Sequence, residues 1–262
     1  MRIMLNFRVN QYHQYMKTKL VLTWIAAIAM IFLMNVTNAN TEPASAKLVG
    51  AWQKSSADNQ TTLICSEKYF SVAVYDLKNK KFIGTYGGSY ALDGEEYVAT
   101  MEFHSLNPET VGNEYRGKAT IQNAVLTLED ESGVNQWKRL DDGGPGKLAG
   151  AWLITGRMRE GEMSKMTPGA RRTMKILSGT RFQWIAYNVE TKEFSGTGGG
   201  TYTTRNGKYT ENIEFFSRDN SRVGASLTFD FSLENGAWRH KGLSSKGDPI
   251  DEVWTKREKI GL

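Results

Sequence analysis

The sequence predicts an all-β protein of two tandem antiparallel barrels that follow an N-terminal signal peptide. Three observations carry this prediction. The pentad LVGAW at residues 48–52 recurs as LAGAW at residues 148–152. Aromatic, glycine and acidic residues that follow the first pentad recur after the second at a constant spacing. Short stretches of alternating apolar and polar residues, separated by turn residues, are typical of an antiparallel meander that closes into a barrel.

The constant spacing indicates two homologous domains. Residues of the first copy have counterparts 112 positions later: Phe70 and Phe182, Tyr75 and Tyr187, Glu102 and Glu214, Val111 and Val223. The same offset across several expected strands means that the intervening loops have equal lengths in both copies. We therefore expect barrel 1 over residues 47–142, a linker at 143–147 and barrel 2 over residues 148–262. The pentads are only 100 positions apart, so the second copy carries about a dozen extra residues after its first strand.

Turn signals set the order of the expected strands. Asp93-Gly94 predicts a tight hairpin in the first copy, because that turn requires positive φ, and Asn206-Gly207 is the matching signal in the second. Strands that begin near Trp137 and Trp254 are expected to close the two barrels. No stretch shows the long helical periodicity of an α-helical domain.

The N-terminal segment is typical of a secretory signal peptide. A short basic region precedes the apolar run at residues 20–34, and small or polar residues at 37–39 suit cleavage. We expect the signal peptide over residues 1–39, with Met16 as an alternative start, and a polar linker at 40–46. An uncleaved membrane anchor is the alternative, although the apolar run is shorter than the roughly 20 residues of a span. The protein is therefore expected in the periplasm or outside the cell, and to meet a membrane only through this peptide during export.

Charge and cysteine content exclude some classes of function. Residues 1–39 carry four basic residues and no acidic one, so without them the net charge falls from +5 to +1. Nucleic-acid binding thereby loses its main support. The single Cys65 excludes an intrachain disulfide and is expected to be a buried, inert thiol.

The residues around the pentads resemble a known family. Gly50-Ala51-Trp52 and Gly150-Ala151-Trp152 are similar to the G-x-W motif that opens lipocalin and calycin barrels. The resemblance covers residues 47–258 and is to the lipocalin-like domains of bacterial secreted proteins. It implies a barrel fold, and a cation from the last strand, Arg139 or Arg257, packed across the motif's tryptophan. Each copy is nearer 100 than 150 residues, which favours a smaller interior than in classical lipocalins.

The family resemblance and the predicted export favour a binding protein for a small, partly apolar ligand, including an anionic or lipid-like one, rather than an enzyme. The extra residues of the second copy are expected to form a flap over the barrel mouth, where arginines suit an anion and methionines an adaptable apolar contact. An ordinary solvated loop is the alternative for this segment. The candidate ligand-binding residues are Arg157, Arg159, Arg171, Arg172, Trp184, Tyr187, Tyr202 and Glu214.

Other functions remain open as alternatives. An isomerase or cyclase would use Glu102 with His104, or Glu214, as acid and base in a barrel mouth. If Glu102 and Glu214 instead face solvent, alternation places Tyr97, Met101 and Phe103 on the core side of the first copy's strand. A structural envelope protein with solid cores is a third possibility.

No cofactor or metal site is expected. Only two histidines lie beyond the signal peptide, and no tight carboxylate cluster accompanies them. Residues 196–200 are glycine-rich, but no helix or Lys-Ser/Thr pair follows, so the glycines are expected to relieve crowding in a bent strand.

Overall fold

A computed structural model describes residues 48–262 apart from 57 and 145, and both predicted barrels are present in it. The expected signal peptide at 1–39 and the linker at 40–46 lie outside the described residues, as does 47, the first expected residue of barrel 1. No helix among the described residues is long and apolar enough to cross a bilayer.

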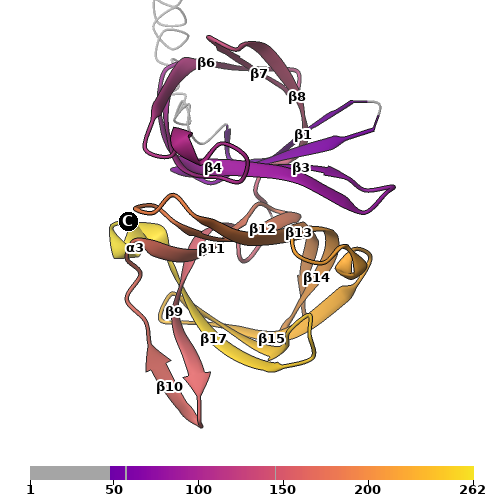
Figure 1. Cartoon of the computed structure of the whole chain (residues 1–262), viewed down its shortest axis with the longest axis vertical. Coiled ribbons are helices and arrows are strands. Elements are labelled where there is room, and N and C mark those ends of the chain that lie inside the picture. Colours follow the sequence, from indigo (N-terminus) through magenta and orange to yellow (C-terminus); the bar gives the residue numbers. More distant parts are fainter. Residues whose placement is uncertain (1–47, 57, 145) are drawn as a thin grey trace, which may run out of the picture. The chain divides into compact units, whose positions relative to one another are not determined.

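Barrel 1 is a closed antiparallel meander of eight strands in which each strand pairs with the next and β1 pairs with β8 (Figure 1). Its strands are β1 (Gly50–Ser55), β2 (Gln60–Cys65), β3 (Tyr69–Asp76), β4 (Lys81–Asp93), β5 (Glu96–His104), β6 (Glu114–Gln122), β7 (Val125–Asp130) and β8 (Gly133–Asp141). A short 3-10 helix, η1 (Pro108–Thr110), follows β5.

Barrel 2 repeats this plan, with β9 and β17 pairing to close it, and adds a strand. Its elements are β9 (Gly150–Arg159), β10 (Glu162–Lys165), β11 (Arg171–Leu177), β12 (Arg181–Asn188), β13 (Phe194–Arg205), β14 (Lys208–Phe216), η2 (Asn220–Arg222), β15 (Ser226–Glu234), β16 (Ala237–Leu243), β17 (Pro249–Lys256) and α3 (Arg257–Ile260). The extra residues of the second copy form the β9–β10 hairpin and the segment after it, and Figure 1 shows this hairpin projecting from the barrel.

The predicted hairpin turns are confirmed. Gly94 has a φ of +60°, and Asn206 and Gly207 have φ values of +50° and +72°. The glycine-rich stretch of β13 is also crowded as expected, because a Cβ on Gly200 would lie 2.1 Å from the carbonyl oxygen of Asn212.

The repeated pentad makes the same internal hydrogen bond at the start of each barrel. The indole Nε1 of Trp52 donates to the carbonyl oxygen of Leu48 at 2.9 Å, and Trp152 donates to Leu148 at 2.8 Å. Both tryptophans are buried in the interiors of their barrels. The pentad is thus a structural element in both copies, in which the indole N–H bonds to the first residue of its own motif.

The cation predicted over each motif tryptophan is present, but one residue differs from the prediction. Arg139 packs across Trp52, with its guanidinium carbon 4.0 Å from the ring centre. In barrel 2 the cation is Lys256, whose Nζ lies 5.4 Å from the Trp152 ring, and the prediction of Arg257 is wrong. The register explains this, since Lys256 is the residue of β17 that pairs with Trp152.

Matching β-bulges occur in β5 and β14. Gly87 pairs with Phe103 and Gly88 with Met101, which leaves Glu102 as the extra residue of β5. Glu214 is the extra residue at the equivalent place in β14. A bulge interrupts the alternation of side chains. Met101 therefore lines the barrel interior, whereas Phe103 packs in the contact between the barrels.

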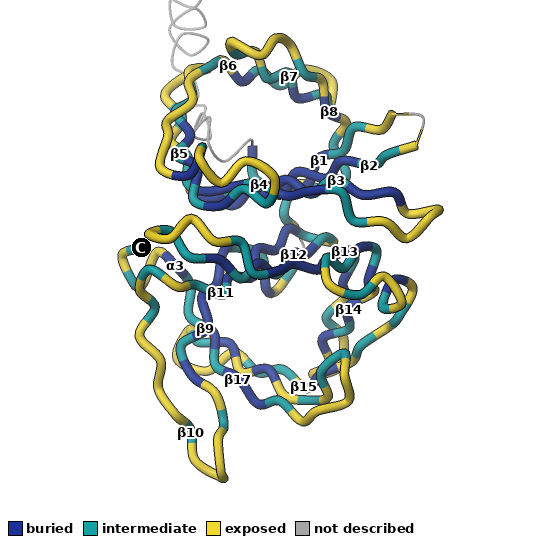
Figure 2. The backbone as a smooth tube through the Cα atoms, in the orientation of Figure 1, coloured by how far each residue is buried: buried dark blue, intermediate teal, exposed yellow. Residues whose placement is uncertain are grey.

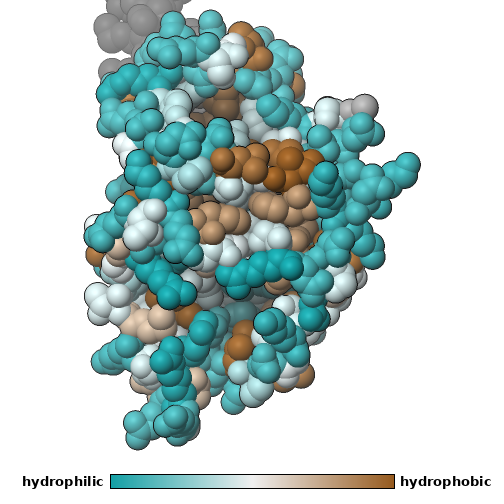
Figure 3. Space-filling view, in the orientation of Figure 1, coloured by the Kyte–Doolittle hydropathy of each residue, from teal (hydrophilic) through white to brown (hydrophobic). Residues whose placement is uncertain are grey.

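The two barrels belong to one compact unit and share an apolar contact. Phe103 packs on Tyr187 with ring centres 4.9 Å apart, and Tyr75 packs on Phe215 at 4.8 Å. Figure 2 shows long buried stretches along β3 and β12, and in Figure 3 hydrophobic side chains gather near the middle of the face in view. Gln183 adds a buried polar contact, because its amide donates to Thr85 of barrel 1 at 2.8 Å and to Thr197 at 3.0 Å.

Candidate functional site

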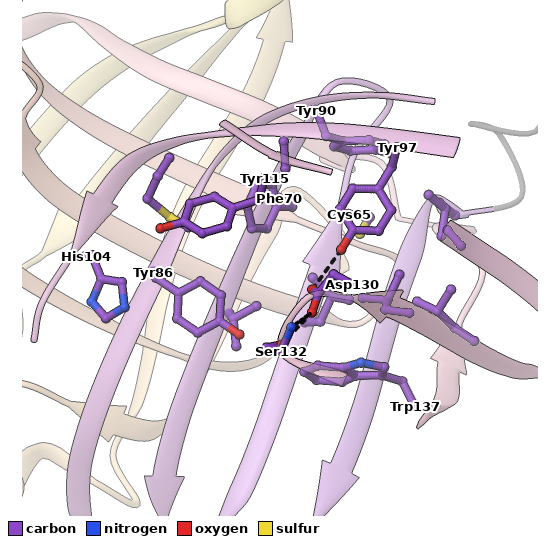
Figure 4. A pocket seen from close by; sticks show the side chains of 18 of the residues that line it. Cys65, Phe70, Tyr86, Tyr90, Tyr97, His104, Tyr115, Asp130, Ser132 and Trp137 are labelled. Atoms are coloured by element: carbon purple, nitrogen blue, oxygen red, sulfur yellow. Dashed lines mark hydrogen bonds between the residues drawn. The ribbon is translucent and has the colours of Figure 1, made fainter. Parts of the chain in front are cut away.

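Barrel 1 encloses a cavity of about 320 Å³ (Figure 4). This volume lies at the lower end of the range of small-molecule sites. Most of its wall is aromatic or aliphatic, and the wall includes Leu63, Cys65, Phe70, Val72, Tyr86, Tyr90, Tyr97, Ala99, Met101, His104, Tyr115, Ala119, Leu126, Leu128, Asp130, Ser132 and Trp137. The wall contains neither lysine nor arginine among the described residues.

Strand alternation places these side chains. In β5 the residues 97, 99 and 101 all face the cavity, because successive side chains of a strand point to opposite faces. The small side chain of Ala99 leaves space where a larger residue would fill the interior.

A carboxylate forms the main polar feature of the cavity. The hydroxyl of Tyr97 donates to Oδ2 of Asp130 at 3.0 Å, and the backbone N–H of Ser132 donates to Oδ1 at 2.8 Å. Burial alone would raise the pKa of Asp130, but the hydrogen bonds from Ser132 and Tyr97 outweigh it and hold the pKa below its ordinary value. Figure 4 shows the aromatic side chains arranged around this carboxylate. Asp130 therefore offers a charged acceptor to a ligand that carries a hydroxyl or an amine.

Two donors of the wall have no partner among the described residues. The buried Nε1 of Trp137 makes no hydrogen bond. The hydroxyl of Tyr86 is likewise without one, although its ring stacks on His104 with centres 5.3 Å apart. Because Nε1 of Trp137 is fully buried, leaving it unpaired costs free energy that an acceptor on a ligand would recover.

His104 has a structural role at one end of the cavity. Its Nδ1 accepts from the backbone N–H groups of Leu106 and Asn107 at 3.2 and 3.0 Å. Burial lowers the pKa of His104, which favours the neutral ring that these bonds require. The imidazole thus shapes the turn after β5.

Cys65 is the buried thiol that the sequence predicts. Its side chain lines the cavity and the residue is 4 % exposed. Burial raises the pKa of the thiol to about 12, so the reactive thiolate is scarce near neutral pH. In the described part of the chain, no group of histidine, cysteine and acidic residues is arranged to hold a metal ion.

The structure brings the four predicted arginines to one groove and places the other predicted ligand-binding residues elsewhere. Arg157 and Trp184 line a second, larger cavity inside barrel 2. Arg159 and Arg171 lie in a groove of about 260 Å³ beside the β9–β10 hairpin, which Arg157 and Arg172 also line. Tyr202 is buried in the core of barrel 2, where its hydroxyl donates to the carbonyl oxygen of Ser178 at 2.6 Å.

Arg172, Tyr187 and Glu214 contribute to the contact between the barrels. Arg172 donates to Glu102 at 3.1 Å, and Tyr187 donates to the same carboxylate at 2.7 Å. Glu214 accepts from Arg181 at 2.7 Å and from Tyr75 at 2.8 Å. Their hydrogen-bonding groups are thus engaged across or beside the contact.

Glu102 lies neither in a barrel mouth nor in open solvent, the two positions that the sequence left open. Its side chain is 12 % exposed, and both of its oxygens accept from Arg257, at 2.9 and 3.1 Å. Burial by itself would raise the pKa of Glu102, but Arg257, Tyr187 and Arg172 outweigh it and lower the pKa. A carboxylate held ionised by two arginines is poorly suited to exchange protons with a substrate.

Sequence reasoning missed the cavity of barrel 1 as a site. Residues 97, 99 and 101 follow the alternation of a core-facing strand, and such a pattern is the same for a filled interior and a hollow one. The contrast between Ala99 and Glu211, which occupy equivalent positions in the two copies, gives no signal of a cavity, because the barrel with the larger residue has the larger cavity.

Comparison with known proteins does not assign the chain to a family. No protein-family model matches the chain, and no curated protein matches it.

Proposed function

We propose that this protein is an exported binding protein that holds a small, partly apolar ligand inside barrel 1. The observation that carries the proposal is the 320 Å³ cavity with its predominantly apolar wall. Hollow interiors in both barrels argue against a structural protein with solid cores. The signal peptide expected at residues 1–39 supports export.

The wall of barrel 1 disfavours an anionic ligand. It contains no cation among the described residues, so the charge of an anion would remain uncompensated. The aromatic side chains suit a flat apolar body. Trp137 and Tyr86 would donate to an acceptor on the ligand, whereas Asp130 would accept from its hydroxyl or amine. A neutral aromatic alcohol or amine meets all of these conditions.

The enzyme alternative receives less support from the same geometry. Glu102 and Glu214 are bonded to arginines and tyrosines at the contact between the barrels, and neither lines a barrel cavity. His104 uses Nδ1 to hold the turn after β5. The carboxylates expected to carry acid-base chemistry therefore serve the assembly of the two barrels.

The test is a titration with N-phenyl-1-naphthylamine, a neutral aromatic amine whose fluorescence rises in an apolar site. We expect the wild type to bind it and Ala99→Phe, which fills the cavity, to lose this binding. Ala91→Phe is the matched control, because Ala91 is exposed on β4 and lines neither barrel cavity. Ala119→Leu provides a second filling variant. Circular dichroism and thermal unfolding would confirm that each variant is folded.

Equal binding by folded Ala99→Phe and by the wild type would contradict a site in barrel 1. Native mass spectrometry of the protein isolated from its own host gives an independent measurement. We expect a bound small molecule at high occupancy in the wild type and at reduced occupancy in Ala99→Phe.

A further inference from the structure

Barrel 2 contains a second cavity whose chemistry differs from that of barrel 1. Its volume is about 870 Å³, and charged side chains lie deep in its wall. Lys175, Glu211 and Glu252 are 5 %, 4 % and 6 % exposed. Nζ of Lys175 donates to Oε1 of Glu211 at 2.6 Å, and Arg157 donates to Oε1 of Glu252 at 2.7 Å.

The equivalent positions of barrel 1 are apolar. Lys175 pairs with the motif tryptophan of β9, and its counterpart Leu63 pairs with the motif tryptophan of β1. Glu211 pairs with Tyr202 in β13, and its counterpart Ala99 pairs with Tyr90 in β4. The fold therefore forms without this ion pair in barrel 1. Burying two charges costs free energy, so the presence of the Lys175–Glu211 pair in barrel 2 is better explained by function than by folding.

The wall of this cavity also holds polar atoms without partners. Both ring nitrogens of His240, a residue that is 2 % exposed, make no hydrogen bond to another described residue, and neither does Nε1 of Trp254. Nδ1 of His240 lies 3.7 Å from Oε2 of Glu252, which is too far for a hydrogen bond. Nζ of Lys175 uses one of its three N–H groups, on Glu211. Buried polar groups normally have partners, so this set points to a ligand.

The unused groups are mainly donors. Lys175 has two N–H groups left, and Trp254 and neutral His240 have one each. Nζ of Lys175 is surrounded by the rings of Tyr209, Phe229, Trp238 and Trp254, at 5.1 to 5.8 Å from their centres. Arg218, Arg222 and Lys246 line the same cavity with Asp219 and Asp248. Of the described residues that line the cavity, five are cations and four are carboxylates, and this balance favours an anionic ligand.

We propose that the cavity of barrel 2 is a separate site for the carboxylate of a small organic acid. The carboxylate accepts from Lys175, His240 and Trp254, and the apolar part of the acid packs against Trp184 and Phe216. These two rings meet edge to face with centres 5.4 Å apart and line the cavity. Fixed donors in a site shielded from water bind a carboxylate more strongly than the same donors at the surface. This site does not depend on the one proposed for barrel 1.

The test compares three acids with the alcohols that match them: benzoate, indole-3-acetate and octanoate against benzyl alcohol, indole-3-ethanol and octanol. Isothermal titration calorimetry at pH 7 should show at least one acid binding roughly ten- to hundredfold more tightly than its alcohol. The double variant Lys175→Leu/Glu211→Ala copies the residues of barrel 1 and leaves no unpaired charge from this pair. We expect it to remain folded and to lose the preference for the acid.

Two controls separate this site from the one in barrel 1. Ala99→Phe should leave the binding of the acid unchanged, whereas the double variant should still bind N-phenyl-1-naphthylamine. Lys256→Met removes a cation that lies over Trp152 and does not line the cavity, and it should keep the preference for the acid. The proposal is overturned if no acid binds more tightly than its alcohol. It is also overturned if the folded double variant keeps the preference.

Discussion

The hydroxyl of Tyr187 in barrel 2 donates a 2.7 Å hydrogen bond to Glu102 of barrel 1, and the same pair occurs in reverse. Tyr75 of barrel 1 donates to Glu214 of barrel 2 at 2.8 Å. Both tyrosines and both glutamates are 112 positions apart. The repeat thus packs against itself within one chain as the subunits of a two-fold dimer pack against each other.

Removal of either tyrosine hydroxyl should weaken the contact between the barrels. A hydrogen bond to a charged group contributes about 1.5–3 kcal/mol. We expect Tyr187→Phe and Tyr75→Phe each to lower the free energy of unfolding by about this amount in urea denaturation. Tyr115→Phe is the control, because Tyr115 is exposed and its hydroxyl has no hydrogen-bond partner among the described residues. An unchanged unfolding midpoint in Tyr187→Phe would show that the observed bond adds no stability.

The free energy of unfolding should decrease as the pH is lowered below the ordinary pKa of histidine, and His240 should be one cause. Burial, followed by the charge of Lys175, lowers the pKa of His240, although Glu252 and Glu211 oppose this. Below about pH 6.5 the unfolded chain binds a proton at this residue that the folded protein does not. Unfolding is then favoured by up to about 1.4 kcal/mol per pH unit until the folded-state pKa is reached.

We therefore expect the free energy of unfolding of His240→Gln to depend less on pH than that of the wild type between pH 6.5 and 5. His104→Gln is the matched control. The pKa of His104 is also lowered by burial, but this side chain is less buried, so its substitution should change the pH dependence less. Identical pH profiles for His240→Gln and the wild type would contradict the neutral state of His240.

Alanine at the pentad glycines should destabilise the two barrels to different extents. Gly50 and Gly150 both have a φ of +127°, which costs a residue with a side chain about 1–3 kcal/mol. A Cβ on Gly50 would also lie 2.2 Å from the carbonyl oxygen of Asp141, whereas one on Gly150 would meet the flexible Lys256 side chain at 3.4 Å. Thermal unfolding should therefore show a larger loss for Gly50→Ala than for Gly150→Ala. Equal losses would mean that backbone strain alone decides the effect.

The repeat, the turns and the first-strand motif were sufficient to predict the fold. Constant spacing is a property of the sequence itself, and Asp93-Gly94 requires a tight turn for local steric reasons. Arg139 was placed correctly over Trp52, but Arg257 was not placed over Trp152. Which residue of the last strand pairs with the tryptophan depends on the register of β17 with β9, and that register is a long-range property.

The sequence by itself determined two homologous β-barrels, a buried Cys65 and the position of the extra segment in the second copy. Only the tertiary structure decided which partners the polar side chains contact. The bulge at Glu102 orients this carboxylate toward Arg257, which lies 155 positions away in the sequence. No local sequence pattern predicts this contact. The two cavities depend likewise on whether side chains from eight strands fill the interior. The volume of a cavity depends on the sizes of side chains from every strand of the barrel. The alternation pattern of any one strand therefore cannot reveal it.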